Sequence, residues 1–136
     1  MLLGEEKNMI MAISSYGKGI DSKIYPKFER CSFFLIVDLE HNTALPITNI
    51  AKKTPHEIGG KVGKLIAKLG IDVIITTDIG PKAFEIFKQN EIKIYRAEGI
   101  IEDSIRQIKK GNLLELTKAT LPRYSNWKKI NDNVLE

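Results

Sequence analysis

The sequence predicts an α/β fold with a five-stranded mixed sheet and helices packed on it, in the order β-β-β-α-β-α-β-α. Two observations lead to this prediction. The stretch from Gly70 to Gly99 contains a strand, a Gly-Pro turn, a helix and a second strand, a succession that implies a parallel, right-handed crossover. Before it, three strand-like segments between Met9 and Ile50 predict an antiparallel meander.

The meander begins with a short apolar run at residues 9–14. Residues 31–40 are the most strand-like part of the chain. His41 and Asn42 can make a tight turn into the third strand at residues 43–50. Pro46 has no N–H to offer a neighbouring strand, so we expect this third strand at an edge of the sheet.

A long connection, residues 15–30, joins the first two strands and is rich in glycine, lysine and serine. A connection of this length without clear structure is uncommon in a compact domain and often has a function. A mobile surface loop is an equally good interpretation.

The first helix begins at a signature in residues 54–57, where Thr54 can cap and Pro55 suits the first helical position. Apolar residues then follow at helical spacing, namely Ile58, Val62, Leu65, Ile66 and Leu69. Three glycines interrupt this helix, Gly59, Gly60 and Gly63. Each costs about 1 kcal/mol relative to alanine. Close packing on the sheet, which we favour, or close approach of a ligand would offset that cost.

The crossover unit continues with an apolar, β-branched strand at residues 72–77, typical of a strand covered on both faces. Gly80 follows it, and Pro81 suits the first position of the second helix. A short strand at residues 92–95 precedes a third helix, whose apolar stripe consists of Ile101, Ile105 and Ile108.

Length and composition indicate one soluble, cytoplasmic domain. We place the domain at residues 1–116, followed by a C-terminal appendage at residues 117–136. No apolar run approaches the ~20 residues of a membrane helix, and the acidic N-terminus is unlike a secretory signal. Cys31 is the only cysteine, which excludes an internal disulfide and fits a reducing compartment. The net charge of +4 favours an anionic partner.

Strand directions predict where a site would lie. If the first strand runs up, the ends of the first, third, fourth and fifth strands share one edge of the sheet with the start of the second. That edge collects residues 15–30, Cys31, the helix start at His56, and the turns at residues 78–81 and 96–99. Ligands of open α/β sheets bind at the carboxyl ends of parallel strands, and helix N-termini there suit anions.

Cys31 and His56 are the candidate metal ligands at this edge. A thiolate binds soft metals and iron–sulfur species, but one thiolate does not hold a whole cluster. A lone cysteine is also often a small buried hydrophobic residue. A lone histidine has no second ligand residue at the spacing typical of a metal site. We interpret His41 as a turn residue.

Four stretches resemble the dinitrogenase iron–molybdenum cofactor biosynthesis family over residues 9–116: KGIDSKIYPKFERCSFFLIVD, the glycine-bearing helix start, IDVIITTDIGPKAFEIF and IKIYRAEGIIEDSIRQIKKGNL. The resemblance implies a ribonuclease H-like fold and a relation to carriers of nitrogenase cofactors and their precursors. Members commonly have a His-Phe-Gly triplet before the second strand, where this chain has Lys27-Phe28-Glu29. A protonated lysine is a poor metal ligand. Some members have counterparts of Cys31 and His56.

The leading hypothesis is therefore a non-enzymatic binding or carrier domain for an anionic metal–sulfur cofactor, an iron–sulfur or iron–molybdenum-type cluster, or its precursor. Cys31 and His56 would contact metal, while the backbones of Gly59–Gly60 and Gly80–Pro81 would face sulfides. A cofactor-assembly protein is the implied partner. The aromatic residues of the tail leave a homodimer open, and neither a membrane nor nucleic acid is expected.

Two alternatives remain open. A metal-dependent nuclease or phosphohydrolase needs carboxylates clustered at the sheet. The first strand has none, Asp21 and Asp78 lie in connecting segments, and Asp38 is expected at the opposite edge. A protein or nucleic-acid interaction module would use Tyr124 and Trp127 in the basic tail.

Overall fold

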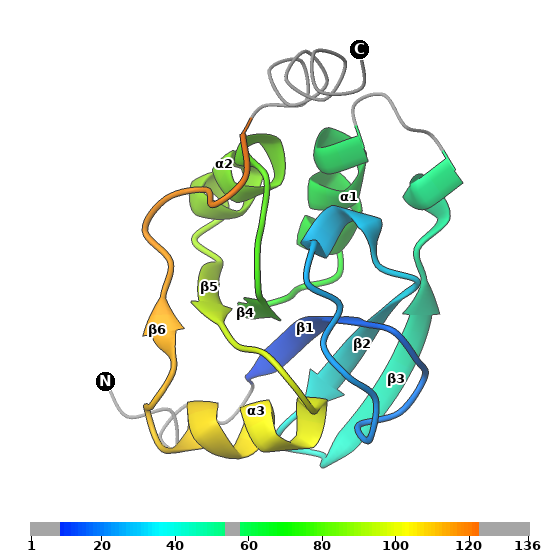
Figure 1. Ribbon diagram of the computed structural model, residues 1–136, viewed down its shortest axis with the longest axis vertical. Coiled ribbons are helices and arrows are strands. Elements are labelled where there is room, and N and C mark those ends of the chain that lie inside the picture. The colour runs from blue at the N-terminus through cyan, green and yellow to red at the C-terminus, as the bar shows by residue number, and fades with distance from the viewer. Residues whose placement is uncertain (1–8, 54–57, 123–136) are drawn as a thin grey trace, which may run out of the picture.

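A six-stranded mixed sheet in the order β3-β2-β1-β4-β5-β6 forms the middle layer of the computed structural model, which describes residues 9–53 and 58–122. Helices α1 and α2 lie together on one face of the sheet and α3 covers the other (Figure 1). The strands are β1 (Ile10–Ser15), β2 (Phe33–Asp38), β3 (Thr43–Thr48), β4 (Val73–Thr76), β5 (Lys93–Arg96) and β6 (Leu114–Glu115). The helices are α1 (Ile58–Ala67), α2 (Pro81–Gln89) and α3 (Ile101–Lys109), with short 3₁₀ helices η2 (Phe28–Arg30) and η3 (Ile50–Lys53).

The predicted meander and crossover are both confirmed. Strand β1 pairs antiparallel with β2, and β2 pairs antiparallel with β3. Strand β1 also pairs parallel with β4, which in turn pairs parallel with β5. Pro46 lies in β3, which is an edge strand as predicted. Pro81 opens α2, again as predicted.

The prediction of five strands is wrong, because β6 adds a sixth. This strand pairs antiparallel with β5 through Tyr95 and Arg96, and the Leu116 N–H donates to the Ile94 carbonyl over 2.8 Å. Its two residues, Leu114 and Glu115, are both exposed. A strand without a buried face has no alternation of apolar and polar residues by which the sequence could reveal it. The free backbone groups at the edge of β5 determine this pairing.

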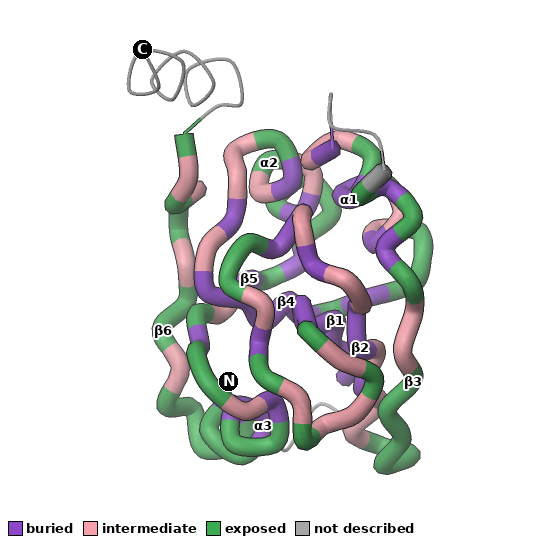
Figure 2. Tube along the Cα trace, turned by 45° about the vertical axis from the view of Figure 1, so that its right-hand side comes forward, coloured by how far each residue is buried: buried purple, intermediate pink, exposed green. Residues whose placement is uncertain are grey.

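The alternation of side chains along the strands produces two hydrophobic clusters, one on each face of the sheet. Along β1, Ala12 belongs to the cluster under α1 and α2, whereas Met11 and Ile13 belong to the cluster under α3. Burial is greatest in the central strands β1 and β4, and the outer strands β3 and β6 are largely exposed (Figure 2). Within the described residues, none of the helices has the length and apolar character to cross a membrane.

The glycines of α1 allow a close approach to α2 and not, as expected, to the sheet. A Cβ atom built on Gly63 would lie 2.9 Å from Ile86 Cδ1 and 3.2 Å from Ile86 Cβ, so a larger residue would force Ile86 to move. A Cβ on Gly59 would lie 3.2 Å from Lys82 Cβ in the first turn of α2. A Cβ on Gly60 would meet no described atom within 4 Å.

Substituting these glycines by alanine tests the packing of α1 on α2. Gly63→Ala should lower the free energy of unfolding by about 1–2 kcal/mol, because the added methyl group overpacks the contact with Ile86. Gly60→Ala should raise it by up to about 1 kcal/mol, because only the better helix propensity of alanine acts there. Urea denaturation measures both values, and equal effects of the two substitutions would contradict the packing described here.

Candidate functional site

The carboxyl ends of β1, β3, β4 and β5 share one edge of the sheet with the start of β2, as the strand directions predicted. Ser15 at the end of β1 pairs with Phe33 at the start of β2, and Phe33 pairs with Thr48 at the end of β3. The ends of β4 and β5 lie at the same edge because both strands run parallel to β1. This edge is therefore the candidate site.

The segment 16–27 runs across this edge and is fixed to it by backbone hydrogen bonds, so the mobile-loop interpretation receives no support. The N–H of Tyr25 donates to the Ser14 carbonyl over 2.9 Å, and that of Asp78 donates to Pro26 over 2.7 Å. Beneath the segment, the buried hydroxyls of Ser14 and Thr76 lie 2.7 Å apart. Backbone thus covers the ends of β1 and β4, and the starts of α1 and α2 are the part of the edge considered next as a ligand site.

Glu29 lies between these two helix starts and is only 6% exposed. Its Oε1 accepts a hydrogen bond of 2.6 Å from the N–H of Gly80, the N-cap residue of α2. A Cβ on Gly59 would lie 3.8 Å from Glu29 Cγ, so the first turn of α1 borders the same side chain. The anion position predicted at the start of α2 is therefore taken by a carboxylate of the chain itself.

Sequence reasoning did not identify Glu29 as a site residue. A single carboxylate next to Arg30 has no spacing that distinguishes it from a surface residue. One signal was present. A Glu or Gln side chain at the third helical position can accept from the N-cap N–H, but in α2 this position is Ala83. The Gly80 N–H therefore needs an acceptor from outside the helix. Only the fold shows that Glu29 provides it.

Burial raises the pKa of Glu29 above its ordinary value, because a carboxylate loses favourable hydration inside the protein. The hydrogen bond from Gly80 and the charge of Arg30 oppose this shift, and the charge of Asp78 adds to it. Glu29 is thus a buried acid. Desolvation favours its protonated form, whereas the hydrogen bond from the N-terminus of α2 favours its charged form.

Asn49 supports the backbone around Glu29. Its Nδ2 donates to the carbonyls of Glu29 and Cys31, each over 2.9 Å. Asn49 is 3% exposed, and its Oδ1 is buried with no hydrogen-bond partner among the residues that the structure describes. The Asn49 Oδ1 atom is therefore a buried acceptor without a donor, on a side chain that contacts the Glu29 turn.

Cys31 lies behind this turn, in the hydrophobic cluster that includes Phe28, Phe34 and Ile58. Its side chain is fully buried, and burial raises the pKa of the thiol to about 12. The structure therefore places Cys31 as a small hydrophobic residue in this conformation, and a metal would reach its sulfur only if the cluster opened. Its role as a metal ligand stays a prediction that this burial does not favour.

The other predicted site residues occupy the helix starts. His56 and the capping signature around it lie outside the described residues. Gly59 and Gly60 are in the first turn of α1, and Gly80 and Pro81 begin α2. Because a Cβ on Gly59 would lie 3.5 Å from the Ala83 nitrogen, the two helix starts are in contact and surround Glu29 together.

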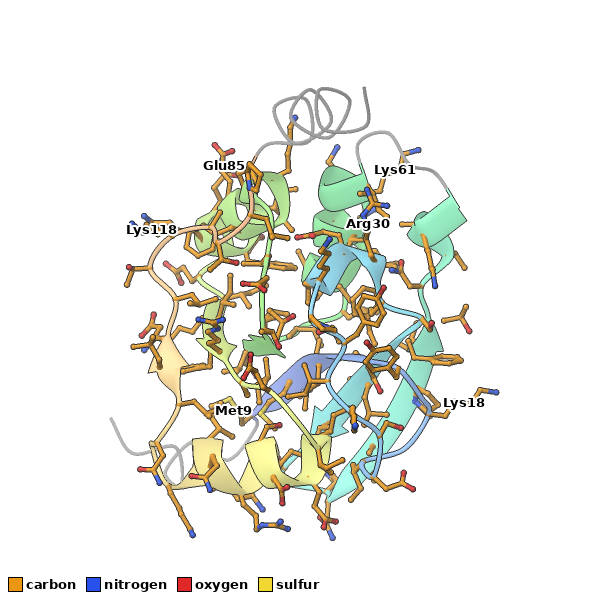
Figure 3. The ribbon with its side chains drawn as sticks, in the orientation of Figure 1. Met9, Lys18, Arg30, Lys61, Glu85 and Lys118 are labelled. Carbon is orange, nitrogen blue, oxygen red and sulfur yellow. The ribbon has the colours of Figure 1, made fainter. Side chains whose placement is uncertain are left out.

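Cationic side chains flank the helix starts. Lys82 is in the first turn of α2, Arg30 follows Glu29, and Lys52 Nζ donates to Ser32 Oγ over 3.3 Å. Arg30 extends beside α1, the helix that carries Lys61 (Figure 3). These charges make the surroundings of the buried carboxylate favourable for an anion.

The segment after β6 returns to the start of α2, and it includes residues 117–122 of the predicted C-terminal appendage. Thr120 Oγ1 accepts a hydrogen bond of 2.8 Å from the Ile79 N–H. The N–H groups of Thr120 and Leu121 donate to the Ile79 carbonyl over 2.9 and 3.1 Å. Residues 117–122 thus reach the candidate site, whereas Tyr124 and Trp127 lie outside the described residues.

One of the carboxylates considered for a hydrolytic enzyme lies away from the candidate site. Asp38 pairs with Ile10 at the start of β1, at the opposite edge, as expected. There it accepts a hydrogen bond of 2.9 Å from His41, which lowers the pKa of Asp38 and raises that of His41. Among the described residues, no group of three or more His, Cys, Asp or Glu side chains could hold a metal ion.

Comparisons with known proteins agree with the resemblance found in the sequence motifs. A family model described as dinitrogenase iron-molybdenum cofactor matches residues 9–111. An uncharacterized protein of Methanocaldococcus jannaschii is 35% identical over 97 residues, which are 68% of this chain and 82% of that protein.

Solved structures show the same fold. The apo form of the orange protein from Desulfovibrio gigas matches with a TM-score of 0.79 at 23% identity, covering 84% of this chain and 98% of that one. A Thermotoga protein of the DUF35 family, with a suggested NifB identity, matches with a TM-score of 0.73 at 31% identity, covering 83% and 97%. The first of these shows the fold alone, because its identity is low.

The burial of Cys31 predicts a protected thiol. At pH 8, its reaction with a disulfide reagent should be at least about 100-fold slower in the folded protein than in urea, because only opening of the cluster exposes the sulfur. Absorbance of the released thiol measures both rates. Equal rates would show that the sulfur is accessible and would restore Cys31 as an open ligand.

The raised pKa of Glu29 predicts a pH dependence of stability. Above pH 4.5, the ordinary pKa of a glutamate, the folded protein binds more protons than the unfolded chain. The free energy of unfolding should therefore fall as the pH rises from 4.5 through the folded pKa of Glu29. Urea denaturation at several pH values measures this loss, which Glu29→Gln should remove.

Glu85→Gln is the matched control, because Glu85 is an exposed residue of α2 and its substitution changes the net charge equally. This variant should keep the pH dependence of the wild type. If Glu29→Gln also keeps it, Glu29 is not the buried acid described here.

Proposed function

The chain belongs to the dinitrogenase iron-molybdenum cofactor family, and from that premise we propose that it is a non-enzymatic binding or carrier domain. Its cargo would be an anionic metal–sulfur cofactor of the iron–sulfur or iron–molybdenum type, or a precursor of one. The site would be the region where α1 and α2 begin. The observation that carries this proposal is the convergence of the two helix starts around Glu29 at the carboxyl edge of the sheet.

The local chemistry supports an anionic cargo. Helix N-termini present N–H groups and the positive end of a dipole, which attract negative charge. A Cβ atom built on Gly60 would meet no described atom within 4 Å, so the backbone at Gly60 is open to a ligand. Lys82 and Arg30 add positive charge nearby. Backbone amides and cations of this kind would hold sulfide or oxygen atoms at the surface of a cluster.

The metal-binding donors support the proposal less well. The thiol of Cys31 is buried and protonated, so it fits a metal only after the surrounding cluster has opened. His56 would be the second metal contact and Gly59, Gly60, Gly80 and Pro81 the backbone contacts. A site with few ligands suits a carrier, because transfer to another protein requires binding that can be reversed, unlike binding in a closed four-ligand site.

Several finer statements belong to the same proposal. We assign the fold to the ribonuclease H-like class, place the binding domain at residues 1–116, and locate the protein in the cytoplasm. A cofactor-assembly protein would deliver or receive the cargo, and a homodimer is compatible with this scheme.

Anaerobic reconstitution with iron and sulfide tests the function. We expect the wild type to develop visible absorption and to retain iron and sulfide after gel filtration. Cys31→Ala would lose this chromophore if the thiol contacts metal and would keep it if backbone amides and His56 suffice. Absence of a chromophore and of bound metal in both proteins would contradict the proposed function.

Charge reversal tests the location of the site. Lys82→Glu should lower the amount of cofactor retained roughly tenfold, because it places a negative charge beside the helix starts. Lys109→Glu is the matched control at the end of α3, on the other face of the sheet, and should retain as much as the wild type. Equal losses in the two variants would place the cofactor elsewhere.

A further inference from the structure

Two tyrosine rings form an exposed aromatic pair at the carboxyl edge of the sheet. The ring centroids of Tyr16 and Tyr25 lie 4.8 Å apart, and the planes of the rings meet at 56°. Tyr25 is half-buried and packs on the hydrophobic cluster under α1 and α2, whereas Tyr16 is 55% exposed. Tyr25 thus supports Tyr16 from the side of the protein, and Tyr16 presents an aromatic ring to the solvent.

The backbone that carries Tyr16 is fixed by hydrogen bonds. The Tyr16 N–H donates to the Lys23 carbonyl over 3.1 Å, and Ser15 Oγ donates to the Gly17 carbonyl over 2.7 Å. A Cβ atom on Gly17 would lie 2.5 Å from Ser22 Oγ, so this turn is closely packed. A ligand that binds the ring therefore meets an ordered segment, which lowers the entropic cost of binding.

Cationic side chains surround the aromatic pair. Lys52 Nζ donates to Ser32 Oγ over 3.3 Å, and Ser32 is next to Phe33, which pairs with Ser15. Lys18 Nζ lies 5.6 Å from the centroid of the Phe33 ring. Residues 16–33 and η3 contribute these exposed or half-buried cations: Lys18, Lys23, Lys27, Arg30 and Lys52. The acids of the same residues are Asp21, which is exposed, and Glu29, which is buried. The surface around the two tyrosines is therefore positively charged.

We propose that this aromatic–cationic surface, formed by Tyr16, Tyr25 and the five cations, binds single-stranded nucleic acid. An exposed ring stacks on an unpaired base of any sequence, and the cations beside it bind the phosphates on either side of that base. The whole chain has the charge that such binding favours, with a net charge of +4 and a pI near 9.1. This function is additional to the proposed carrier function and does not depend on it.

The composition of the surface favours nucleic acid over a protein partner. The core of a protein interface is depleted of charged residues, because apolar side chains are buried there together. Next to Tyr16 in the chain are Gly17 and Lys18, and the backbone of Lys23 pairs with that of Tyr16. Cations rather than apolar side chains thus adjoin the ring, as stacking of a base between phosphates requires.

The sequence does not reveal this surface. The rings of Tyr16 and Tyr25 meet because Ser15 pairs with Ile24 across the intervening turn, a contact that exists only in the fold. The aromatic residues of the basic tail, which the sequence suggests for stacking, lie outside the described residues. The aromatic–cationic surface is therefore a separate candidate for contact with nucleic acid.

Fluorescence anisotropy of a labelled oligothymidylate of about 15 nucleotides tests the proposal with the full chain. The wild type should bind this probe, and its affinity should fall at least about tenfold between about 50 and 200 mM salt, because phosphate contacts release counterions. A duplex of the same length should bind more weakly at each salt concentration, since its paired bases are not free to stack on a ring.

Substitutions of Tyr16 test the stacking contact. Tyr16→Ala should weaken binding at least about fivefold, because the ring is lost. Tyr16→Phe keeps the ring and should stay within about twofold of the wild type. Leu114→Ala is the matched control, because it truncates another exposed apolar side chain, in β6, and it should also stay within about twofold.

Charge reversal tests the cations. Lys18→Glu should lower the affinity at least about fivefold at low salt and should make binding less dependent on salt, because a phosphate contact is removed. Lys109→Glu makes the same change in net charge at an exposed position in the last turn of α3, and its effect should be smaller.

Three results would overturn the proposal. The first is no binding of the oligothymidylate by the wild type at low salt, and the second is equal affinity of the wild type and Tyr16→Ala. The third is equal affinity for the oligothymidylate and for a polyglutamate peptide of the same charge, which would show attraction of any polyanion. These titrations contain no iron or sulfide, so their failure leaves the carrier function to be decided by anaerobic reconstitution.

Discussion

The hydrogen bond between the Glu29 carboxylate and the Gly80 N–H is the interaction on which the architecture of the candidate site depends. It joins the turn before β2 to the start of α2, two segments separated by 51 positions in the chain. Burying a carboxylate is costly unless hydrogen bonds and charges compensate it. Here the compensation comes from a backbone N–H at a helix N-terminus and from the neighbouring charge of Arg30.

The packing of α1 on α2 places a second helix start next to this contact. Gly63 allows the two helices to approach closely, and Gly59 brings the first turn of α1 against Lys82 and Glu29. The segment 16–27 covers the ends of β1 and β4, beside these helix starts.

Much of the fold could be predicted, because strand direction and helix boundaries depend on local signals. Pro46 indicated an edge strand and Pro81 a helix start, and both predictions are confirmed. Strand β6 was missed because two exposed residues produce no periodicity. The partner of Gly63 was missed for a different reason: helical periodicity shows which face of α1 is apolar but not which element packs on it. The site was harder to predict from the sequence, because the contact between Glu29 and Gly80 forms only when η2 and α2 come together in the fold.

A ¹³C NMR titration of the Glu29 side-chain carboxyl group tests the central claim most directly, with Glu29→Gln used to assign the resonance. The account predicts a pKa above the ordinary glutamate value of 4.5, with the Gly80 amide resonance following the same midpoint. A pKa at or below 4.5, together with a Gly80 amide that does not respond to it, would contradict the account. That result would mean that the carboxylate of Glu29 is hydrated and does not accept the hydrogen bond of the Gly80 N–H.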